Sequence, residues 1–420
     1  MTATADSTRV AGVESSRRWV ARAAWSVAAQ ALSSVTNFGL TVGLVVALTA
    51  DEMGRTLSVL SVYLLALTLS RSLVTESVVA SADDDRSAGV RSWPWARARI
   101  LRIAGAAMIG SAAVGLSLNL DPVTLAVLVG ALPILLLQDG QRYRAMAADR
   151  HRLAASLDGC WLLVSLVLGA SAHLLGATWT SAMLIGVWSA GGLVSWSLGL
   201  FSGASLPETK HAAGGNPDAG AVANPERRDR YRSLAYSQAV AVIAINLAPL
   251  IIAVALSPTM AAATKAVLIP FTAMLSLTAG LRVVTLPTIR RAIDDGRANQ
   301  LLARLLLALT AATAVVSALT VGAVSLLEPS TLGESFALVE PYLVLGAVLC
   351  VLYVLNQQLA DAVALSGRAD APVRRMIGIA MEWSGLFIGA GLAGVGGMMA
   401  GWTIGLALAT GFWLLTWLRR

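Results

Sequence analysis

The sequence predicts an all-α, polytopic membrane protein with about 12 transmembrane helices in two six-helix lobes. Hydrophobic residues fill 56% of the 420 positions, and charged residues fill only 13%. Apolar runs of about 20 residues, the length that an α-helix needs to cross a bilayer, recur along the chain. Arginine gathers in alternate loops, as it does on the cytoplasmic side of membrane proteins. Together these observations argue against a soluble enzyme.

Sequence motifs give no sign of a cofactor, a metal or catalysis. Cys160 and Cys350 lie inside apolar runs without CxxC or Cys/His spacing. His151, His173 and His211 are scattered and form no ligand pattern. A P-loop and a Ser/His/Asp arrangement are both lacking, so we expect neither an enzyme nor an ATP-driven pump. Membrane topology explains the net charge of +7 better than a nucleic-acid partner does.

The hydropathy pattern divides the chain into twelve spans. The first 16 residues are polar, and the apolar run after them is too long for a cleaved signal peptide, so we expect the N-terminus to be retained. The predicted spans are roughly 24–49, 56–80, 99–119, 122–143, 155–176, 179–202, 233–256, 262–287, 301–327, 337–363, 375–394 and 397–418. A glycine-rich turn near Gly396 separates the last two.

Basic residues set the expected orientation. The N-terminus, the alternate loops and the C-terminus hold 26 of the 31 basic residues. The other five are Arg55, Arg71, Arg102, Lys265 and Arg282. Because cytoplasmic loops retain Lys and Arg, we expect both termini in the cytoplasm of a multi-pass cell-membrane protein.

The longest polar segment, 203–232, is expected to be a cytoplasmic linker. Its Gly, Pro, Ala and charged residues cannot form a core. It separates an N-terminal lobe (1–202) from a C-terminal lobe (233–420), with six spans in each. An even number of spans brings the second half into the membrane from the same side as the first. The halves would therefore be a parallel repeat about an axis along the membrane normal.

Paired polar positions support this duplication. Gln30 and Asn37 in the first span correspond to Gln238 and Asn246 in the seventh, at offsets of 208 and 209. Two intramembrane arginines, Arg71 and Arg282, are 211 positions apart. The fourth and tenth spans end alike, with Gln138, Asp139, Gln141 and Arg142 in one and Gln357, Gln358 and Asp361 in the other. A duplicated six-helix unit accounts for all four features.

Arg71 is the first candidate for a functional site. A charge in hydrocarbon costs at least a few kcal/mol, so such a residue faces the protein interior or a watery cavity. Asp139, Arg282, Asp361 and Glu382 also fall in the inner parts of their spans. This asymmetry predicts a polar basin that opens to the cytoplasm at the seam between the lobes. Arginine there suits a phosphate or pyrophosphate cargo.

Each candidate also has a structural interpretation. Arg71 can form an ion pair with Glu382 or Glu76, and Arg282 can snorkel to the interface. Asp139 and Arg142 lie three residues apart on one helical face and can pair. Four amides serve more often as interhelical hydrogen-bond partners than as ligands, although they remain candidates: Gln30, Asn37, Gln238 and Asn246.

Residues 30–71, QALSSVTNFGLTVGLVVALTADEMGRTLSVLSVYLLALTLSR, carry a resemblance to a known family. Their polar-spotted helix, short acidic turn and second helix resemble the opening of polysaccharide-exporter flippases in the multidrug/oligosaccharidyl-lipid/polysaccharide exporter superfamily. The segment 138–161, QDGQRYRAMAADRHRLAASLDGCW, is similar to one found in actinobacterial members. The resemblance implies a V-shaped transporter that moves a lipid-linked oligosaccharide by alternating access. Its expected partners are the lipid-linked glycan, membrane lipid, and a glycan polymerase or glycosyltransferases.

The chain differs from members of this family in its arginine positions and its number of helices, and these differences bear on which cargo we expect. Related murein-precursor flippases place cavity arginines on helices 1, 2 and 8, and Arg71 and Arg282 match only helices 2 and 8. The first span has no arginine inside it, and Arg22 lies just before its start. Fourteen-helix members also have two extra C-terminal spans. The resemblance therefore favours another polyprenyl-linked glycan over a peptidoglycan precursor.

Two other functions remain open. Drug or metabolite antiporters of the same superfamily commonly carry a carboxylate in the middle of helix 1 or 7. Neither span here has an interior Asp or Glu, which favours the flippase. The other alternative is a non-transporting membrane scaffold in a glycan-assembly complex.

Overall fold

The computed structural model describes residues 24–25, 28–75, 93–203, 225–272, 274–275, 289, 292–293, 295–326 and 333–419, and for 203 and 225–235 the helical backbone only. Within these ranges the regular structure is helical and no strand occurs. Ten of the described helices are long and apolar enough to cross a membrane. The predicted fold class, an all-helical multi-pass membrane protein, is therefore confirmed.

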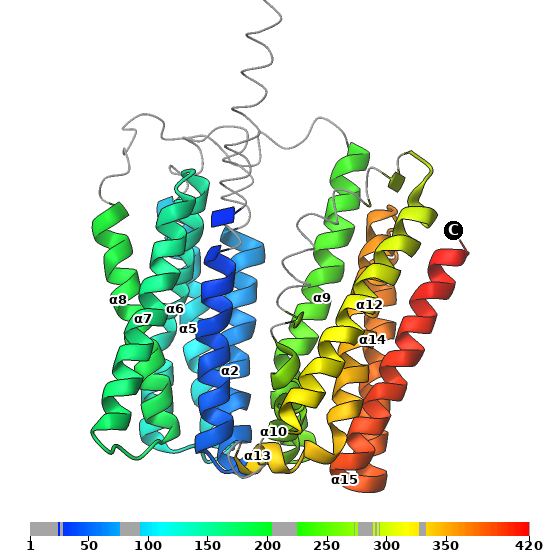
Figure 1. Cartoon of the computed structure of the whole chain (residues 1–420). Helices are drawn as coiled ribbons and strands as arrows, with labels where there is room; N and C mark the ends of the chain where they lie inside the picture. Colours follow the sequence, from blue (N-terminus) through cyan, green and yellow to red (C-terminus); the bar gives the residue numbers. More distant parts are fainter. Residues whose placement is uncertain are drawn as a thin grey trace, which may run out of the picture.

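The first bundle holds six helices at positions close to the predicted spans (Figure 1). They are Ala28–Ala47, α2 (Ala50–Ser70) with a π-helical turn at Arg71–Thr75, α5 (Trp93–Ser117), α6 (Pro122–Ala147), α7 (His151–Leu174) and α8 (Ser181–Gly203). Local signals fix the helix starts. Thr49 caps α2 by accepting a hydrogen bond from the Glu52 N–H at 3.3 Å, and Asp121 caps α6 ahead of Pro122.

The second bundle is built from the remaining helices. They are α9 (Pro225–Ala255), α10 (Pro258–Ala266), η3 (Ile269–Phe271), α12 (Ala298–Val324), α13 (Glu334–Ala337), η5 (Glu340–Tyr342), α14 (Leu343–Leu365) and α15 (Ala371–Leu418). The predicted eighth span corresponds to α10 and η3, and Arg282 lies outside the described residues. Helix α9 begins inside the predicted linker, because Pro225 opens a run of charged helix formers.

Helix α15 combines the last two predicted spans. Its helical geometry breaks at Ala393 and Gly394, where the chain reverses. The two arms then pack backbone to backbone: a Cβ on Gly389 would collide with the Gly397 carbonyl oxygen, and one on Gly385 would collide with that of Gly401. Glycines at these positions let two helices approach more closely than any side chain allows.

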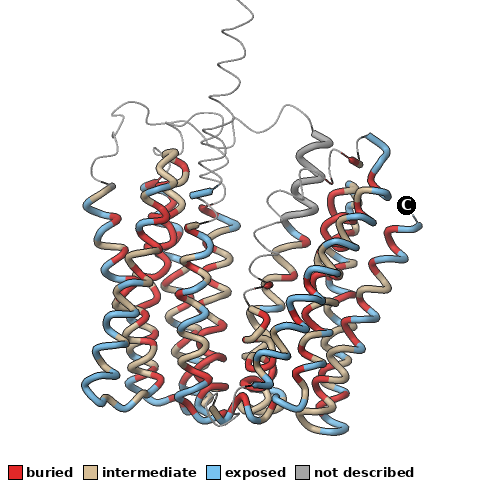
Figure 2. Tube along the Cα trace, in the orientation of Figure 1, coloured by how far each residue is buried: buried red, intermediate tan, exposed pale blue. Residues whose placement is uncertain are grey.

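The two bundles meet at the lower end of Figure 1 and diverge toward the upper end. At the lower end α2 packs against α9 and α10, and a Cβ on Gly54 would collide with the Pro258 carbonyl oxygen. The Ser58 hydroxyl donates to the Pro249 carbonyl oxygen at 3.3 Å. Buried residues gather inside each bundle and again at this contact (Figure 2). One hydrophobic cluster therefore continues from the first bundle into the second.

Candidate functional site

Arg71 lies at the upper end of α2, where the π-helical turn begins. The helix starts at Ala50, six residues before the predicted span, so Arg71 lies about 32 Å along it, close to the thickness of a hydrocarbon core. Its Nε donates to Asp139 Oδ2 at 3.0 Å and its Nη2 to Asp139 Oδ1 at 2.6 Å. This bidentate pair occupies one side of the guanidinium fork. The partner of Arg71 is thus Asp139 and not Glu382, while Glu76 lies outside the described residues.

Arg142, one helical turn beyond Asp139 on α6, forms a second buried cluster with its neighbours. Its side chain is only 4% exposed, and its Nε lies 3.2 Å from Asp158 Oδ2 on α7. Its Nη2 donates to Gln30 Oε1 of the first helix at 2.8 Å. The predicted pair with Asp139 is present at 3.8 Å, which is the longest of the three contacts. Together with Arg71, which binds Asp139, these side chains join four helices at the upper end of the first bundle.

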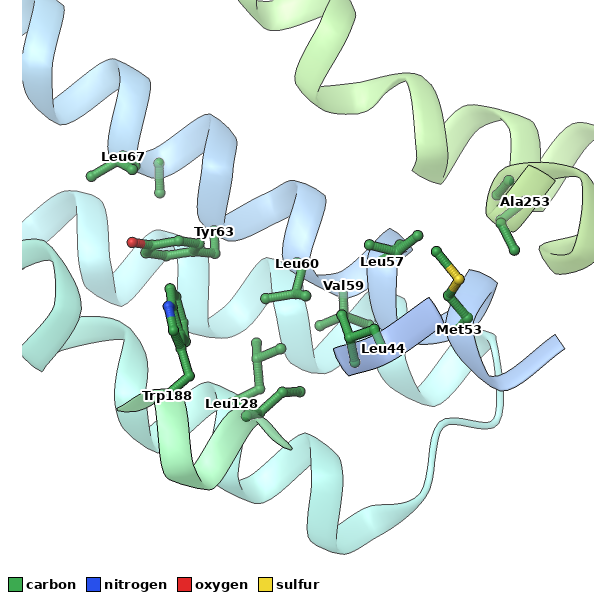
Figure 3. Packing of buried hydrophobic residues seen from close by; sticks show 14 of the residues in the cluster. Leu44, Met53, Leu57, Val59, Leu60, Tyr63, Leu67, Leu128, Trp188 and Ala253 are labelled. Carbon is green, nitrogen blue, oxygen red and sulfur yellow. The ribbon is translucent and has the colours of Figure 1, made fainter. Parts of the chain in front are cut away.

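A tightly packed aromatic layer lies below this charged cluster. Tyr63 is 3% exposed and meets Trp188 edge to face, with 5.5 Å between ring centroids. The Trp161 indole donates to the Trp188 carbonyl oxygen at 2.7 Å. Figure 3 shows Tyr63 and Trp188 close together, with Leu60 of α2 and Leu128 of α6 beside them. The interior of the first bundle is therefore filled by ion pairs at one end and by packed side chains below them.

The predicted amides have different environments. Asn246 of α9 joins the bundles, because its Nδ2 donates to Thr68 Oγ1 at 3.0 Å and to the Leu64 carbonyl oxygen at 3.3 Å. Gln30 accepts from Arg142, as described above, and Asn37 accepts a bond from Thr41 through its backbone carbonyl oxygen. Gln238 lines a cavity in the second bundle. These amides thus do not converge on a single site.

The second bundle encloses a cavity of about 410 Å³. It is lined by α9, α10, α14 and both arms of α15, together with residues near η3. Five aromatic side chains contribute: Tyr353, Trp383, Phe387, Trp402 and Trp413. Its longer polar side chains are Gln238, Lys265, Asn356, Gln357, Gln358, Arg375 and Glu382. An apolar pocket with a few polar groups is the usual form of a small-molecule site.

Glu382 lies near the middle of the first arm of α15. It is 11 residues from the break at Ala393, about 17 Å along the helix. The Trp402 indole of the second arm donates to Glu382 Oε1 at 2.7 Å. A carboxylate at this depth is costly, so its indole partner and its place on a cavity wall mark it as a functional candidate.

Two cationic side chains line different parts of the cavity. Toward the upper end, Arg375 donates to Gln357 Oε1, and Gln357 Nε2 donates to Asp361 Oδ1 at 3.3 Å. Toward the lower end, Lys265 reaches the cavity from the last turn of α10. Within the described part of the chain, no hydrogen bond or ion pair engages its ammonium group. The cavity lining thus includes two cations and a carboxylate.

The sequence pattern predicted only part of this site. Gln238, Gln357, Gln358 and Glu382 stand out in the sequence as polar residues inside spans, whereas no pattern pointed to the aromatic lining. The available signal was Trp402, which follows Glu382 by 20 residues across the glycine-rich turn. The described residues hold no group of three or more His, Cys, Asp or Glu side chains placed to bind a metal.

The fold is similar to those of several solved transporter structures. An inward-facing multidrug resistance MATE family transporter of the MOP superfamily aligns with a TM-score of 0.65 at 12% identity, covering 94% of this chain and 98% of that one. An outward-facing structure of such a transporter aligns at 0.58, with 13% identity and 95% of both chains covered. A mutant of the Vibrio cholerae MATE transporter VcmN aligns at 0.57, with 13% identity, 96% of this chain and 98% of that one.

Matches by sequence are lacking, since no family model and no curated protein matches the chain. The likeness to the solved structures therefore establishes the fold. The descriptions of two of these structures assign those transporters to the MOP superfamily. The narrower resemblance, to polysaccharide-exporter flippases, stays a hypothesis.

Proposed function

We propose that this protein is a membrane transporter that works by alternating access, and that its cargo is a glycan carried on a polyprenyl phosphate or diphosphate. The observation that carries the proposal is the cavity in the second bundle. It combines four amide side chains with five aromatic ones, and it has two cationic side chains. Amides donate and accept hydrogen bonds, as sugar hydroxyls require, while Lys265 and Arg375 suit an anionic phosphate.

The arrangement of the bundles supports alternating access. They touch through backbone and short side chains at the lower end, where Gly54 meets Pro258, and diverge toward the upper end. The distribution of basic residues predicts that the upper end is cytoplasmic. In that orientation the bundles are in contact from the outer side up to the Asn246–Thr68 hydrogen bond, and they diverge beyond it toward the cytoplasm. The higher TM-score with the inward-facing relative, 0.65 against 0.58, agrees with this assignment.

The charged cluster of the first bundle has a place in the same proposal. Arg71 keeps its side chain 28% exposed although Asp139 engages it, so part of the guanidinium remains accessible for a cargo phosphate. Arg282, its predicted counterpart, would complete the cytoplasmic basin. A polymerase or glycosyltransferases would supply or consume the glycan.

An amphipathic organic cation is the second candidate cargo, and Glu382 is the observation that favours it. A half-buried carboxylate among aromatic rings suits a cationic aromatic molecule, through ion pairing and cation–π contact. This cargo corresponds to the drug or metabolite antiporter that the sequence left open.

Transport in proteoliposomes separates the two cargoes. The purified protein is reconstituted with a fluorescent polyprenyl-diphosphate oligosaccharide, and movement between leaflets is followed with a membrane-impermeant quencher. Efflux of an aromatic cationic dye is measured in parallel. We expect movement of the glycolipid and none of the dye. The opposite pattern would make the protein a cation exporter, and movement of neither would favour the scaffold.

A matched pair of variants links transport to the cavity. Gln238 lines the cavity, whereas Gln300 is exposed on α12. Loss of one neutral hydrogen bond to cargo costs about 0.5–1.5 kcal/mol, so Gln238→Ala should weaken cargo binding roughly two- to tenfold. Gln300→Ala should behave as the parent protein does. Equal behaviour of both variants would remove the cavity from the transport pathway.

A further inference from the structure

Helix α5 presents a continuous exposed stripe along its length. In the second half of the helix, Ile109 is 75% exposed and Leu116 is 70% exposed. The same stripe, at steps of three or four residues, continues to Arg102, Arg99 and Trp95 at the other end. Most of this stripe is apolar, and no other described helix covers it. This side of α5 therefore faces lipid.

The arginines of this stripe lie at the level of the lipid headgroups. A hydrocarbon core of about 30 Å covers about 20 residues of a helix at 1.5 Å per residue. Counted from Ser117 at the opposite end, the core ends near Arg97. Arg99 therefore lies at the boundary, and Arg102 lies one turn inside, from where its long side chain reaches back to the headgroups.

Two contacts hold this end of α5 in a fixed arrangement. The Arg99 guanidinium lies over the Trp95 ring, 4.2 Å from its centroid. On the opposite face Trp93 packs against α6, so that a Cβ on Gly140 would lie 3.0 Å from its ring. In the described ranges of the chain, no carboxylate and no other side chain pairs with Arg99 or Arg102. Among the residues that the structure describes, their positive charge therefore has no counterion at the interface.

We propose that Trp95, Arg99 and Arg102 form a binding site for the headgroup phosphate of an anionic phospholipid. The tryptophan prefers the interface, and the two guanidinium groups offer several N–H donors to one phosphate. The lipid-facing stripe below them accommodates the acyl chains. This proposal does not depend on the identity of the cargo.

The second bundle provides a matched control in Arg304 of α12. This arginine is exposed near the corresponding end of its helix, and its stripe continues to Leu307, which is 73% exposed. It has neither a second arginine nor a tryptophan beside it at i−4 or i−3, where Gln300 and Leu301 stand. It thus shares the general basic character of this membrane side without the cluster.

Native mass spectrometry of the whole protein tests the site. Bound phosphatidylglycerol is counted while its concentration is raised, with phosphatidylcholine as the neutral lipid. Near the membrane surface each Lys or Arg contributes enough attraction that its removal should weaken binding roughly fivefold. We expect Arg99→Gln with Arg102→Gln to lose one bound phosphatidylglycerol, Arg99→Lys to keep part of the binding, and Arg304→Gln to leave it unchanged.

Two further measurements decide the interpretation. All variants carry exposed substitutions, and gel filtration checks that each remains folded. Inorganic phosphate at millimolar concentration should not displace the lipid, because it lacks the acyl chains. Displacement by phosphate would overturn the lipid assignment in favour of a general anion site. Unchanged lipid binding in the double variant, or an equal loss in Arg304→Gln, would reduce the arginines to topology signals.

Discussion

The two bundles use their interior polar side chains in opposite ways. In the first bundle Arg71, Asp139, Arg142 and Asp158 bind one another, and packed aromatic rings fill the space below them. In the second bundle the polar groups line a cavity of about 410 Å³. The first bundle thus uses its charges in helix packing, whereas in the second bundle Arg375 and Glu382 have hydrogen-bond partners but also line a cavity. A charge inside a span is therefore a weaker sign of a binding site than a charge beside a cavity.

Removing Arg142 should have the largest effect. Arg142→Ala leaves the Asp158 side chain, 1% exposed, without its ion-pair partner, and loss of one member of a buried pair costs about 3–5 kcal/mol. We expect a steep fall in membrane abundance and in thermal stability in detergent. Arg304→Gln on the exposed face of α12 is the control. If Arg142→Ala has normal membrane abundance and a normal melting temperature, the charged cluster does not hold the first bundle together. The contrast between the two bundles would then be wrong.

The glycine contact in α15 should have a smaller effect than Arg142. Gly389→Leu forces a side chain against the Gly397 backbone, and overpacking of this kind typically costs about 1–3 kcal/mol. Gly391 lies two residues away, and a Cβ added there would have no neighbouring atom within 4 Å, so Gly391→Leu is a matched control. We expect lower melting temperatures for the first variant only. Equal melting temperatures would mean that the hairpin does not brace the cavity wall.

Arg71 sharpens the comparison, because it is both a bundle residue and a cargo candidate. Hydrogen bonds to charged groups are worth about 1.5–3 kcal/mol, so Arg71→Ala should lower abundance, and Arg71→Lys should lower it less. Adding Asp139→Asn to Arg71→Ala should restore part of the loss by removing the unpaired carboxylate. Normal abundance with lost transport would instead assign Arg71 to cargo binding, as its place in the sequence suggested.

Substitution of Glu382 in the second bundle corresponds to substitution of Arg71 in the first. Glu382→Gln keeps the shape and the acceptor for the Trp402 indole, so stability should change by only about 1 kcal/mol. Transport of a glycolipid should persist, because an amide serves a sugar as well as a carboxylate does. Loss of dye efflux in proteoliposomes, with stable protein, would point to an organic cation. Trp402→Phe, which removes the donor, tests whether the hydrogen bond positions the carboxylate.

The smallest effect is expected at Asp370, where the second bundle has an ion pair at its surface. Hydrogen bonds from Arg368 and Arg374 hold the pKa of Asp370 below its ordinary value. Its contribution is therefore present above the pKa of the unfolded chain and is lost as pH falls through the lower folded pKa. Exposed pairs contribute less than about 1 kcal/mol. Melting curves of Asp370→Asn and the parent should differ slightly at neutral pH and converge in acid.

The sequence by itself determined the helical membrane class and most helix positions. Apolar runs are local, and so are the signals that start helices, such as Asp121 before Pro122 in α6. The sequence also located the polar positions at Asp139, Arg142, Gln238 and Glu382. The predicted parallel repeat, the linker and the cytoplasmic termini remain predictions of the same local pattern.

Only the tertiary structure decided which polar side chains meet and where space remains. Arg71 pairs with Asp139, 68 positions later, because the packing of α2 against α6 brings their upper ends together. Glu382 faces Trp402 because the chain reverses at Ala393 and Gly394 and its glycines let the two arms touch. Hydropathy records how apolar a helix is, but partner and cavity depend on how each helix is rotated and packed against others. That information lies in contacts between distant segments, and no local pattern carries it.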